Sequence, residues 1–214
     1  MQRWSVVIPV KPVSVGKSRL RGAVPEAAHE ALALALARDT VAAVVACPEV
    51  AEALVVTDDP VVAEVVIALG ARVTPDTPAA GLNPAIRYGE SGFSARSWRA
   101  ALTADLPALR PAELAAALRA ATESPPRRRF AADAPGIGTV LLTAPPGVPL
   151  DPRFGGPSAA AHAASGAVAL TGDWPSLRRD VDTGADLDAA HRLGVGAHTG
   201  ALAPTPCGPG AAPC

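Results

Sequence analysis

The chain has 214 residues, 49% of them hydrophobic but only 3% aromatic, which suits one α/β domain with a core of Ala, Val and Leu. Its formal net charge of −1 excludes a general nucleic-acid binder, which would normally carry a basic excess. Cys47, Cys207 and Cys214 are too widely spaced for a disulfide framework or a zinc site. Because no apolar run is typical of a signal peptide or a membrane span, we expect a cytoplasmic protein that binds neither membrane nor nucleic acid.

The first predicted element is a strand at residues 6–8, whose β-branched side chains suit burial on both faces. The cations Lys11, Lys17 and Arg19 follow within nine residues. Crevices at the carboxyl ends of parallel strands bind ligands, so this loop suits a polyphosphate. A solvated basic loop explains the same residues about equally well. A P-loop is excluded, because Lys11 stands where that motif needs its first glycine.

Helical and strand patterns then alternate along the chain, which predicts βαβ units and a mostly parallel central sheet with helices on both faces. Asn83 and Ser158 are the expected caps of two of the helices. We expect one domain over residues 1–196 and a disordered Ala/Pro/Gly tail over 197–214. The predicted helices are 25–46, 61–69, 83–88, 111–122, 159–165 and 186–193, and the predicted strands are 53–57, 71–74, 99–103, 129–132, 138–143 and 177–181.

Acidic side chains follow two of these strands. Asp105 comes after strand 99–103, and Asp180 and Asp182 lie at the end of strand 177–181 and beyond it. Alternation in an extended segment points both carboxylates of a D-x-D pair to one face. Such oxygens suit Mg²⁺, which takes one or two carboxylates plus substrate phosphates. A turn residue at 105 and a helix cap at 182 are the alternatives, and each is stronger when its residue is taken alone.

A second candidate site is a small-anion nest. Gly155 and Ser158 belong to a Gly-Gly-Pro-Ser turn before a helix, which offers backbone N–H groups and a hydroxyl. Thr139 offers another hydroxyl after Gly-Ile-Gly. Ordinary turn chemistry explains each of these positions about equally well. No nucleophile arrangement stands out, and the histidines receive no role.

Motifs over nearly the whole chain resemble the phosphoenolpyruvate or 2-phospho-L-lactate guanylyltransferases of deazaflavin coenzyme F-420 biosynthesis. They are P-V-K-x-x-x-x-G-K-S-R-L (9–20), G-L-N-x-A-I (81–86), A-D-L-P-A-L (104–109), G-I-G-T (136–139), P-R-F-G-G-P-S (152–158), S-G-A-V-x-L-T-G-D-W-P-S-L-R-x-D-V-D-T (165–183) and A-D-L-D-A-A-x-x-L-G-V-G (185–196). The chain departs from the family at Ala104, which replaces a glycine, in segment 132–137, and in a short loop before Asn83.

The resemblance implies a Rossmann-like nucleotidyltransferase fold and transfer of GMP from GTP to the phosphate of phosphoenolpyruvate. It implies the following roles: Lys11, Lys17, Arg19 and Asn83 bind the nucleotide, Asp105, Asp180 and Asp182 hold Mg²⁺, and Thr139, Gly155 and Ser158 bind the small acid. It also implies handover of the product to the next enzyme of the pathway. Alternative acceptors are 2-phospho-L-lactate, 3-phosphoglycerate, a sugar phosphate or molybdopterin, and a non-catalytic nucleotide-binding relative is the alternative of another class.

Overall fold

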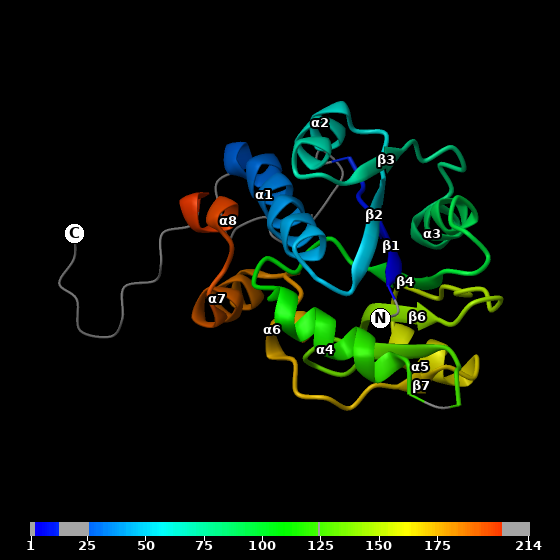
Figure 1. Ribbon diagram of the computed structural model, residues 1–214. Coiled ribbons are helices and arrows are strands. Elements are labelled where there is room, and N and C mark those ends of the chain that lie inside the picture. Colours follow the sequence, from blue (N-terminus) through cyan, green and yellow to red (C-terminus); the bar gives the residue numbers. More distant parts are fainter. Residues whose placement is uncertain (1–2, 13–25, 124, 203–214) are drawn as a thin grey trace.

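The computed structural model describes residues 3–12, 26–123 and 125–202, which fold around a seven-stranded sheet with strand order β3-β2-β1-β4-β6-β5-β7 (Figure 1). Neighbours pair in parallel except at β4–β6 and β5–β6, where β6 runs antiparallel. The predicted α/β class with a mostly parallel sheet is therefore confirmed. The strands are β1 (Trp4–Pro9), β2 (Val50–Val56), β3 (Arg72–Thr74), β4 (Trp98–Leu102), β5 (Arg129–Ala132), β6 (Thr139–Ala144) and β7 (Val168–Ala169).

Helices cover both faces of the sheet. One face carries the first, second and fourth helices, and the other carries the third and fifth (Figure 1). Pro60 and Pro111 each begin a helix, where a missing N–H costs nothing. The helices are α1 (Glu26–Val45), α2 (Pro60–Ala68), α3 (Leu82–Ser91), α4 (Pro111–Ala121), α5 (Ser158–Ala164), α6 (Pro175–Arg178), α7 (Gly184–Leu193) and α8 (Ala197–Leu202).

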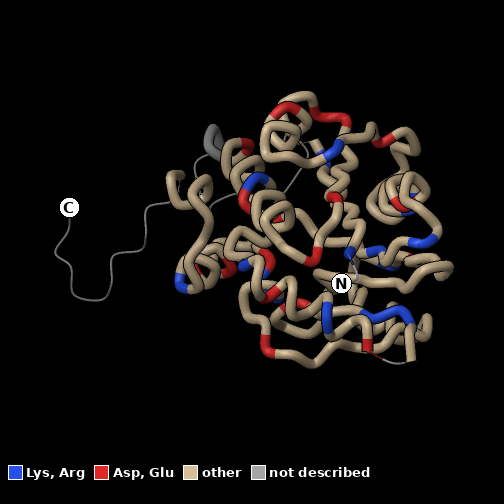
Figure 2. The backbone as a smooth tube through the Cα atoms, viewed as in Figure 1, with Lys and Arg blue, Asp and Glu red and all other residues tan. Residues whose placement is uncertain are grey.

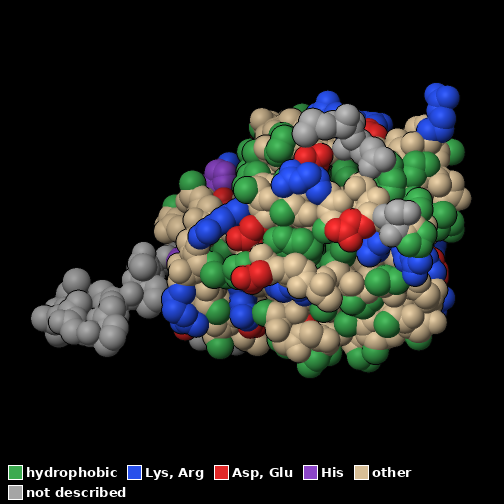
Figure 3. All heavy atoms as spheres, turned by 60° about the horizontal axis from the view of Figure 1, so that its bottom comes forward, with side chains coloured by type: hydrophobic (Ala, Val, Ile, Leu, Met, Phe, Trp, Pro, Cys, Tyr) green, Lys and Arg blue, Asp and Glu red, His purple; other side chains and the backbone are tan. Residues whose placement is uncertain are grey.

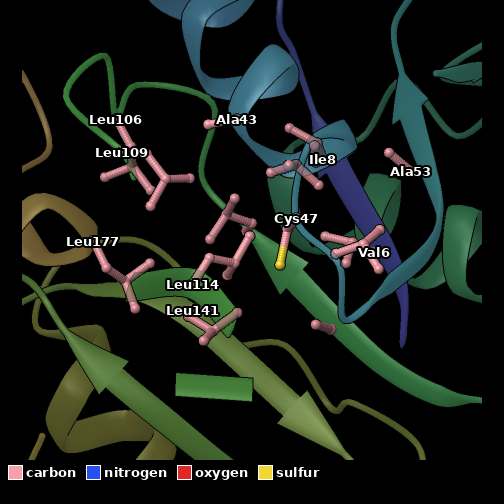
Figure 4. Close-up of a cluster of buried hydrophobic side chains, with 14 of the residues drawn as sticks. Val6, Ile8, Ala43, Cys47, Ala53, Leu106, Leu109, Leu114, Leu141 and Leu177 are labelled. Carbon is pink, nitrogen blue, oxygen red and sulfur yellow. The ribbon is translucent and has the colours of Figure 1, made fainter. Parts of the chain in front are cut away.

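The core divides along the central strand β1. Val6 and Ile8 join the cluster beneath α1, α2 and α4, whereas Val7 joins the cluster beneath α3 and α5, because side chains alternate along a strand. Figure 4 shows the first cluster, in which small and branched side chains surround the buried thiol of Cys47. Burial raises the pKa of this thiol. Every residue of β1 is buried, as its β-branched run predicts.

Three local predictions are wrong. Residues 177–181 do not form a strand, because Pro175 begins the short helix α6, and Leu177 and Val181 are buried in two different clusters. Asn83 does not cap α3: it lies inside the helix, after the N-cap residue Gly81. Ser158 does not cap α5 either. It is the first residue of that helix, Pro157 occupies the N-cap position, and no side-chain capping hydrogen bond is made there.

The predicted disorder is wrong for residues 197–202, which form α8 against α1. The Asp39 carboxylate on α1 accepts hydrogen bonds from the backbone N–H groups of His198 (3.1 Å) and Thr199 (2.8 Å). These bonds satisfy donors at the start of α8 that would otherwise lack partners. Residues 203–214 lie outside the described part of the chain.

Charged residues of both signs are distributed over the described chain, as Figure 2 shows along the backbone. On the face seen in Figure 3, acidic and basic side chains alternate with hydrophobic ones, and no single sign dominates. This distribution agrees with the net charge of −1. Within the described residues, no helix combines the length and apolarity that crossing a membrane would require.

Candidate functional site

Three of the predicted site residues, Lys11, Asp105 and Thr139, lie at the same end of neighbouring strands. Because β1 and β4 are parallel, their carboxyl ends lead to Lys11 and Asp105 at the same edge. The antiparallel β6 begins at this edge with Thr139, and the Thr103 N–H donates to the Val140 carbonyl at 3.0 Å. The chain runs from β1 to β2 in one direction and returns to β4 on the other side, a switch point of the kind that binds ligands in open α/β sheets.

The backbone around Asp105 is held from α1 by a buried hydroxyl. Thr40 Oγ1 shares its hydrogen between the carbonyls of Leu36 (2.8 Å) and Ala104 (3.2 Å) and accepts from the N–H of Leu106 (2.9 Å). A hydroxyl can serve in this way because it has one hydrogen and two lone pairs. The half-buried Asp105 therefore sits between two backbone groups that Thr40 fixes.

The D-x-D segment lies directly beside Asp105. The Val181 N–H donates to the Asp105 carbonyl at 3.0 Å, so the residue between the two aspartates is bonded to the segment that follows β4. Arg178 joins this segment to the end of β5, donating to the Ala132 carbonyl at 2.8 Å. Val181 is buried, while Asp182 is exposed.

The carboxylates do not form a complete metal cage by themselves. Among residues 3–12, 26–123 and 125–202, no three His, Cys, Asp or Glu side chains are grouped so that they could hold a metal ion. Mg²⁺ needs fewer protein ligands when substrate phosphates and water supply the others. The adjacency of Asp105 to the D-x-D segment fits such a shared site and does not fit an all-protein one.

The loop between β5 and β6 is shaped by Asp133. Its carboxylate accepts hydrogen bonds from the N–H groups of Ile137 (2.8 Å) and Gly138 (2.7 Å), immediately before Thr139. A Cβ at position 138 would collide with the same carboxylate, so glycine is needed there. The altered segment 132–137 therefore forms a closed turn in this chain. The Ala159 N–H donates to the Ile137 carbonyl at 3.0 Å, which joins the start of α5 to that turn.

The loop that carries the Gly-Gly-Pro-Ser turn is held along its backbone by one face of α3. Asn83 Oδ1 accepts from the Phe154 N–H (2.8 Å), and Asn83 Nδ2 donates to the Phe154 carbonyl (3.0 Å). Glu90 Oε1 accepts from the Leu150 N–H at 2.8 Å, and Arg87 donates to the Pro152 carbonyl at 3.4 Å. Residues 83, 87 and 90 share a helix face because they follow the i, i+4, i+7 spacing.

Glu90 is also paired with Arg99 on β4. Arg99 Nη1 lies 3.1 Å from Glu90 Oε1, and the two side chains are 12% and 9% exposed. A carboxylate this deeply buried requires a cationic partner, because desolvation of an unpaired charge is costly. The pair allows Glu90 to present a charged acceptor to the loop.

Arginines surround the same loop on its other side. Arg128 donates to Asp151 Oδ2 (3.1 Å) and to the hydroxyl and carbonyl of Ser165, and Arg153 Nη2 donates to the same Asp151 oxygen at 3.1 Å. Burial alone would raise the pKa of Asp151, but the hydrogen bonds and charges of the two arginines outweigh it and lower the pKa. These bonds also hold Asp151 at a φ of +50°, a conformation that few non-glycine residues adopt.

Of the predicted acceptor residues, Thr139 and Ser158 are buried, at 5% and 3% exposed. Gly155 is exposed and has a φ of +104°, which requires glycine. Of the predicted nucleotide residues, Lys11 is exposed after β1, while Lys17 and Arg19 lie outside the described residues. Asn83 binds the Phe154 backbone but keeps one N–H and one lone pair, so a nucleotide contact stays a prediction.

Three side chains that shape the site had no assigned role in the sequence. Glu90 and Asp133 bond loop N–H groups, and His162 on α5 contacts Thr139. Helical spacing from Asn83 to Glu90 was an available signal for the α3 face. His162 carried none, because its partners come from a strand and a loop that are distant in sequence.

The fold resembles that of nucleotidyltransferases. A nucleotidyl transferase from Methanothermobacter thermautotroptrophicus superimposes with a TM-score of 0.67 at 19% identity, covering 90% of this chain and 98% of that one. A putative nucleotide-diphospho-sugar transferase from Desulfovibrio desulfuricans G20 gives 0.66 at 16% identity, covering 90% and 87%. At these identities the likeness establishes the fold.

Sequence relatives identify the family within this class. The chain is 68% identical to the phosphoenolpyruvate guanylyltransferase of Salinispora arenicola, over 95% of each chain, and 54% identical to that of Geodermatophilus obscurus, over 94% of each. No protein-family model matches the sequence. The chain belongs to the phosphoenolpyruvate guanylyltransferase family and is an enzyme.

Proposed function

We propose that this enzyme transfers GMP from GTP to the phosphate of phosphoenolpyruvate, giving enolpyruvoyl-2-diphospho-5′-guanosine and diphosphate. The observation that carries the proposal is the convergence of Asp105, Thr139 and the start of α5 on one sheet edge. This arrangement sets a carboxylate suited to a metal beside hydroxyl and N–H donors suited to a small anion. The names of the close relatives support the choice of substrates.

The reaction needs no side chain as nucleophile or general base. A phosphate monoester with a second pKa of about 6 is largely dianionic at neutral pH. One of its oxygens attacks the α-phosphorus of GTP, a new P–O bond forms, and the bond to the leaving diphosphate breaks. In-line positioning and neutralisation of negative charge are what the protein must supply.

The nucleotide side of the site is assigned to the loop after β1 and to α3. Lys11, Lys17 and Arg19 neutralise the triphosphate, and Asn83 contributes to holding the nucleoside. Asp105 with Asp180 or Asp182 would hold Mg²⁺, which when bound supplies positive charge against the phosphates. The adjacent backbones of Asp105 and Val181 support this pairing.

The acceptor side is assigned to Thr139, Gly155 and Ser158. A buried hydroxyl at position 139, a second at position 158 and a left-handed glycine at 155 offer donors that suit a phosphate and a carboxylate. The product is proposed to enter coenzyme F-420 assembly and to be handed to the next enzyme there.

The test is acceptor-dependent release of diphosphate from GTP in the presence of Mg²⁺. Phosphoenolpyruvate, 2-phospho-L-lactate, 3-phosphoglycerate, a sugar phosphate and no acceptor are compared, with ATP replacing GTP as the matched nucleotide control. We expect release with GTP and phosphoenolpyruvate. Release with a different acid alone would correct the acceptor. No release from folded, GTP-binding protein would support a non-catalytic relative, and Ala104→Gly would then be the first reversion to assay.

A further inference from the structure

His162 is an internal residue of α5 that bridges two parts of the acceptor site. Its side chain is completely buried, between the rings of Phe130 (5.9 Å between centroids) and Phe154 (5.1 Å). One ring nitrogen, Nδ1, lies 2.9 Å from Thr139 Oγ1, and the other, Nε2, lies 2.9 Å from the backbone nitrogen of Arg153. The ring therefore contacts β6 and the loop before α5 at once.

The Arg153 contact determines the tautomer. A backbone N–H can only donate, so Nε2 must accept and cannot carry a hydrogen. A neutral imidazole with an unprotonated Nε2 carries its hydrogen on Nδ1. Nδ1 thus donates, and the Thr139 hydroxyl oxygen accepts. Burial lowers the pKa of His162 to about 4, with smaller opposing contributions from the Ser158 carbonyl and Asp151 and a further lowering by Arg128 and Arg153, so the ring stays neutral at physiological pH.

This donor–acceptor order leaves the Thr139 hydrogen directed away from His162. Within the described residues, the Thr139 hydroxyl has no second hydrogen-bond partner. We propose that His162 is a positioning residue that turns the Thr139 hydroxyl hydrogen toward the phosphate or carboxylate of the acceptor. The inference rests on the proposed function for the identity of that anion. The same ring holds the Arg153 backbone, so hydroxyl direction and loop position are set together.

The first test determines the tautomer of His162 and requires no activity assay. Nitrogen-15 NMR of the imidazole groups, with His162→Gln to assign the resonance, distinguishes Nδ1–H from Nε2–H. We expect the Nδ1–H form from pH 8 down to pH 5. An Nε2–H form would make Thr139 the donor to His162 and would overturn the proposal. This measurement stands even if phosphoenolpyruvate proves not to be the acceptor.

The second test is a double-mutant cycle in the diphosphate-release assay. His162→Gln keeps an oxygen near the Nε2 position for the Arg153 N–H but removes the donor to Thr139. Loss of one hydrogen bond to a charged group predicts an increase in acceptor KM of about 10- to 100-fold for Thr139→Val and an increase in the same direction for His162→Gln. Because both act through one hydroxyl, the double variant should be no worse than Thr139→Val alone.

Controls separate positioning from folding. His162→Asn keeps an N–H near the Nδ1 position and should recover much of the acceptor KM lost in His162→Gln. His198→Gln changes a histidine on α8 and should leave both KM values unchanged. Additive effects in the double variant, or equal increases in the KM of GTP and of the acceptor, would overturn the positioning role. Wild-type turnover with each acceptor reports separately on the proposed function.

Discussion

The proposed site has two halves that differ in how their functional groups are held. The acceptor half comprises Thr139, Gly155 and Ser158 with the side chains that hold them, and the carboxylate half comprises Asp105, Asp180 and Asp182. In the acceptor half, buried or half-buried side chains bond the loop backbone directly: Asn83 and Glu90 from α3, and His162 from α5. In the carboxylate half, Thr40 and Val181 fix the backbone at Asp105, but within the described residues no three acidic, His or Cys side chains are grouped to hold a metal ion. Side chains thus hold the backbone of the loop in the first half, whereas in the second half the contacts described here hold the backbone beside Asp105.

Electrostatics explains this difference. Neutral hydroxyl and amide groups can be set in place at little cost once each has a partner. Carboxylates packed together without a cation repel one another and raise each other's pKa. The proposed metal site would therefore gain from carboxylates that are not fully buried: Asp182 is exposed, and Asp105 and Asp180 are half-buried. Under the proposed function, we expect the acceptor half to fix the position of the small acid and the carboxylate half to bind the cation that arrives with the nucleotide.

The largest expected effect comes from breaking the carboxylate half with Asp105→Asn. The substitution keeps the shape and removes the charge, so kcat should fall by roughly 10²- to 10³-fold, a loss typical of removing one charge-stabilising group. The Kd for GTP should change much less, because the metal acts mainly on charge that develops in the transition state. Steady-state diphosphate release and calorimetric GTP binding measure the two quantities. Asp188→Asn, at an exposed position of α7, is the matched control, and wild-type kcat in Asp105→Asn would refute the metal role.

How far the sequence predicts this molecule depends on the range of the interactions involved. Strands such as β1 and β6 are predictable, because a buried β-branched run is a local signal. The wrong predictions at 177–181 and 197–202 have distant causes. In segment 177–181, Leu177 and Val181 pack into two different core clusters. In segment 197–202, the carboxylate of the distant Asp39 bonds the start of the helix. Neither cause is visible within a window of ten residues.

The same reasoning applies to the site. Asp105 and Thr139 could be proposed because they stand at strand ends, which the fold class brings to one edge. His162 could not, because a single histidine in an alanine-rich helix has no spacing that indicates a role. Its partners lie 23 and 9 residues away and meet only after β6 and the loop are packed. Candidate ligand-binding groups are therefore accessible to sequence reasoning, and the groups that hold them in place are not.

A smaller effect on the acceptor half is expected from pH. The pKa of His162 is about 4 in the folded state, below the ordinary value of 6.5, so the unfolded chain binds a proton that the folded chain excludes. The neutral buried ring therefore contributes to the unfolding free energy. This contribution is fully present above pH 6.5 and is lost as the pH falls toward 4. Between pH 7 and pH 5 the loss should be about 2 kcal/mol of unfolding free energy. Urea unfolding of the wild type and of His162→Gln at both pH values measures it.

The comparison with the variant isolates this histidine from the other titrating groups. His162→Gln should lose about 2 kcal/mol less than the wild type over that pH range, while His198→Gln should follow the wild type. Equal losses in the wild type and in His162→Gln would mean that the folded protein accepts a proton at this position, and the neutral ring of the acceptor half would have to be abandoned.

The smallest expected effect tests whether α3 belongs to the acceptor half or to the nucleotide half. Asn83→Ala removes both hydrogen bonds to the Phe154 backbone. The loop should loosen, and the acceptor KM should increase about tenfold, the cost of roughly one such bond. The KM for GTP should increase as well, because the remaining N–H and lone pair of Asn83 are proposed to contact the nucleoside. Ser91→Ala, at the exposed end of α3 with only a local bond to Tyr88, is the control and should change neither value. An unchanged KM for GTP would remove Asn83 from the nucleotide half, and an unchanged acceptor KM would remove it from the acceptor half.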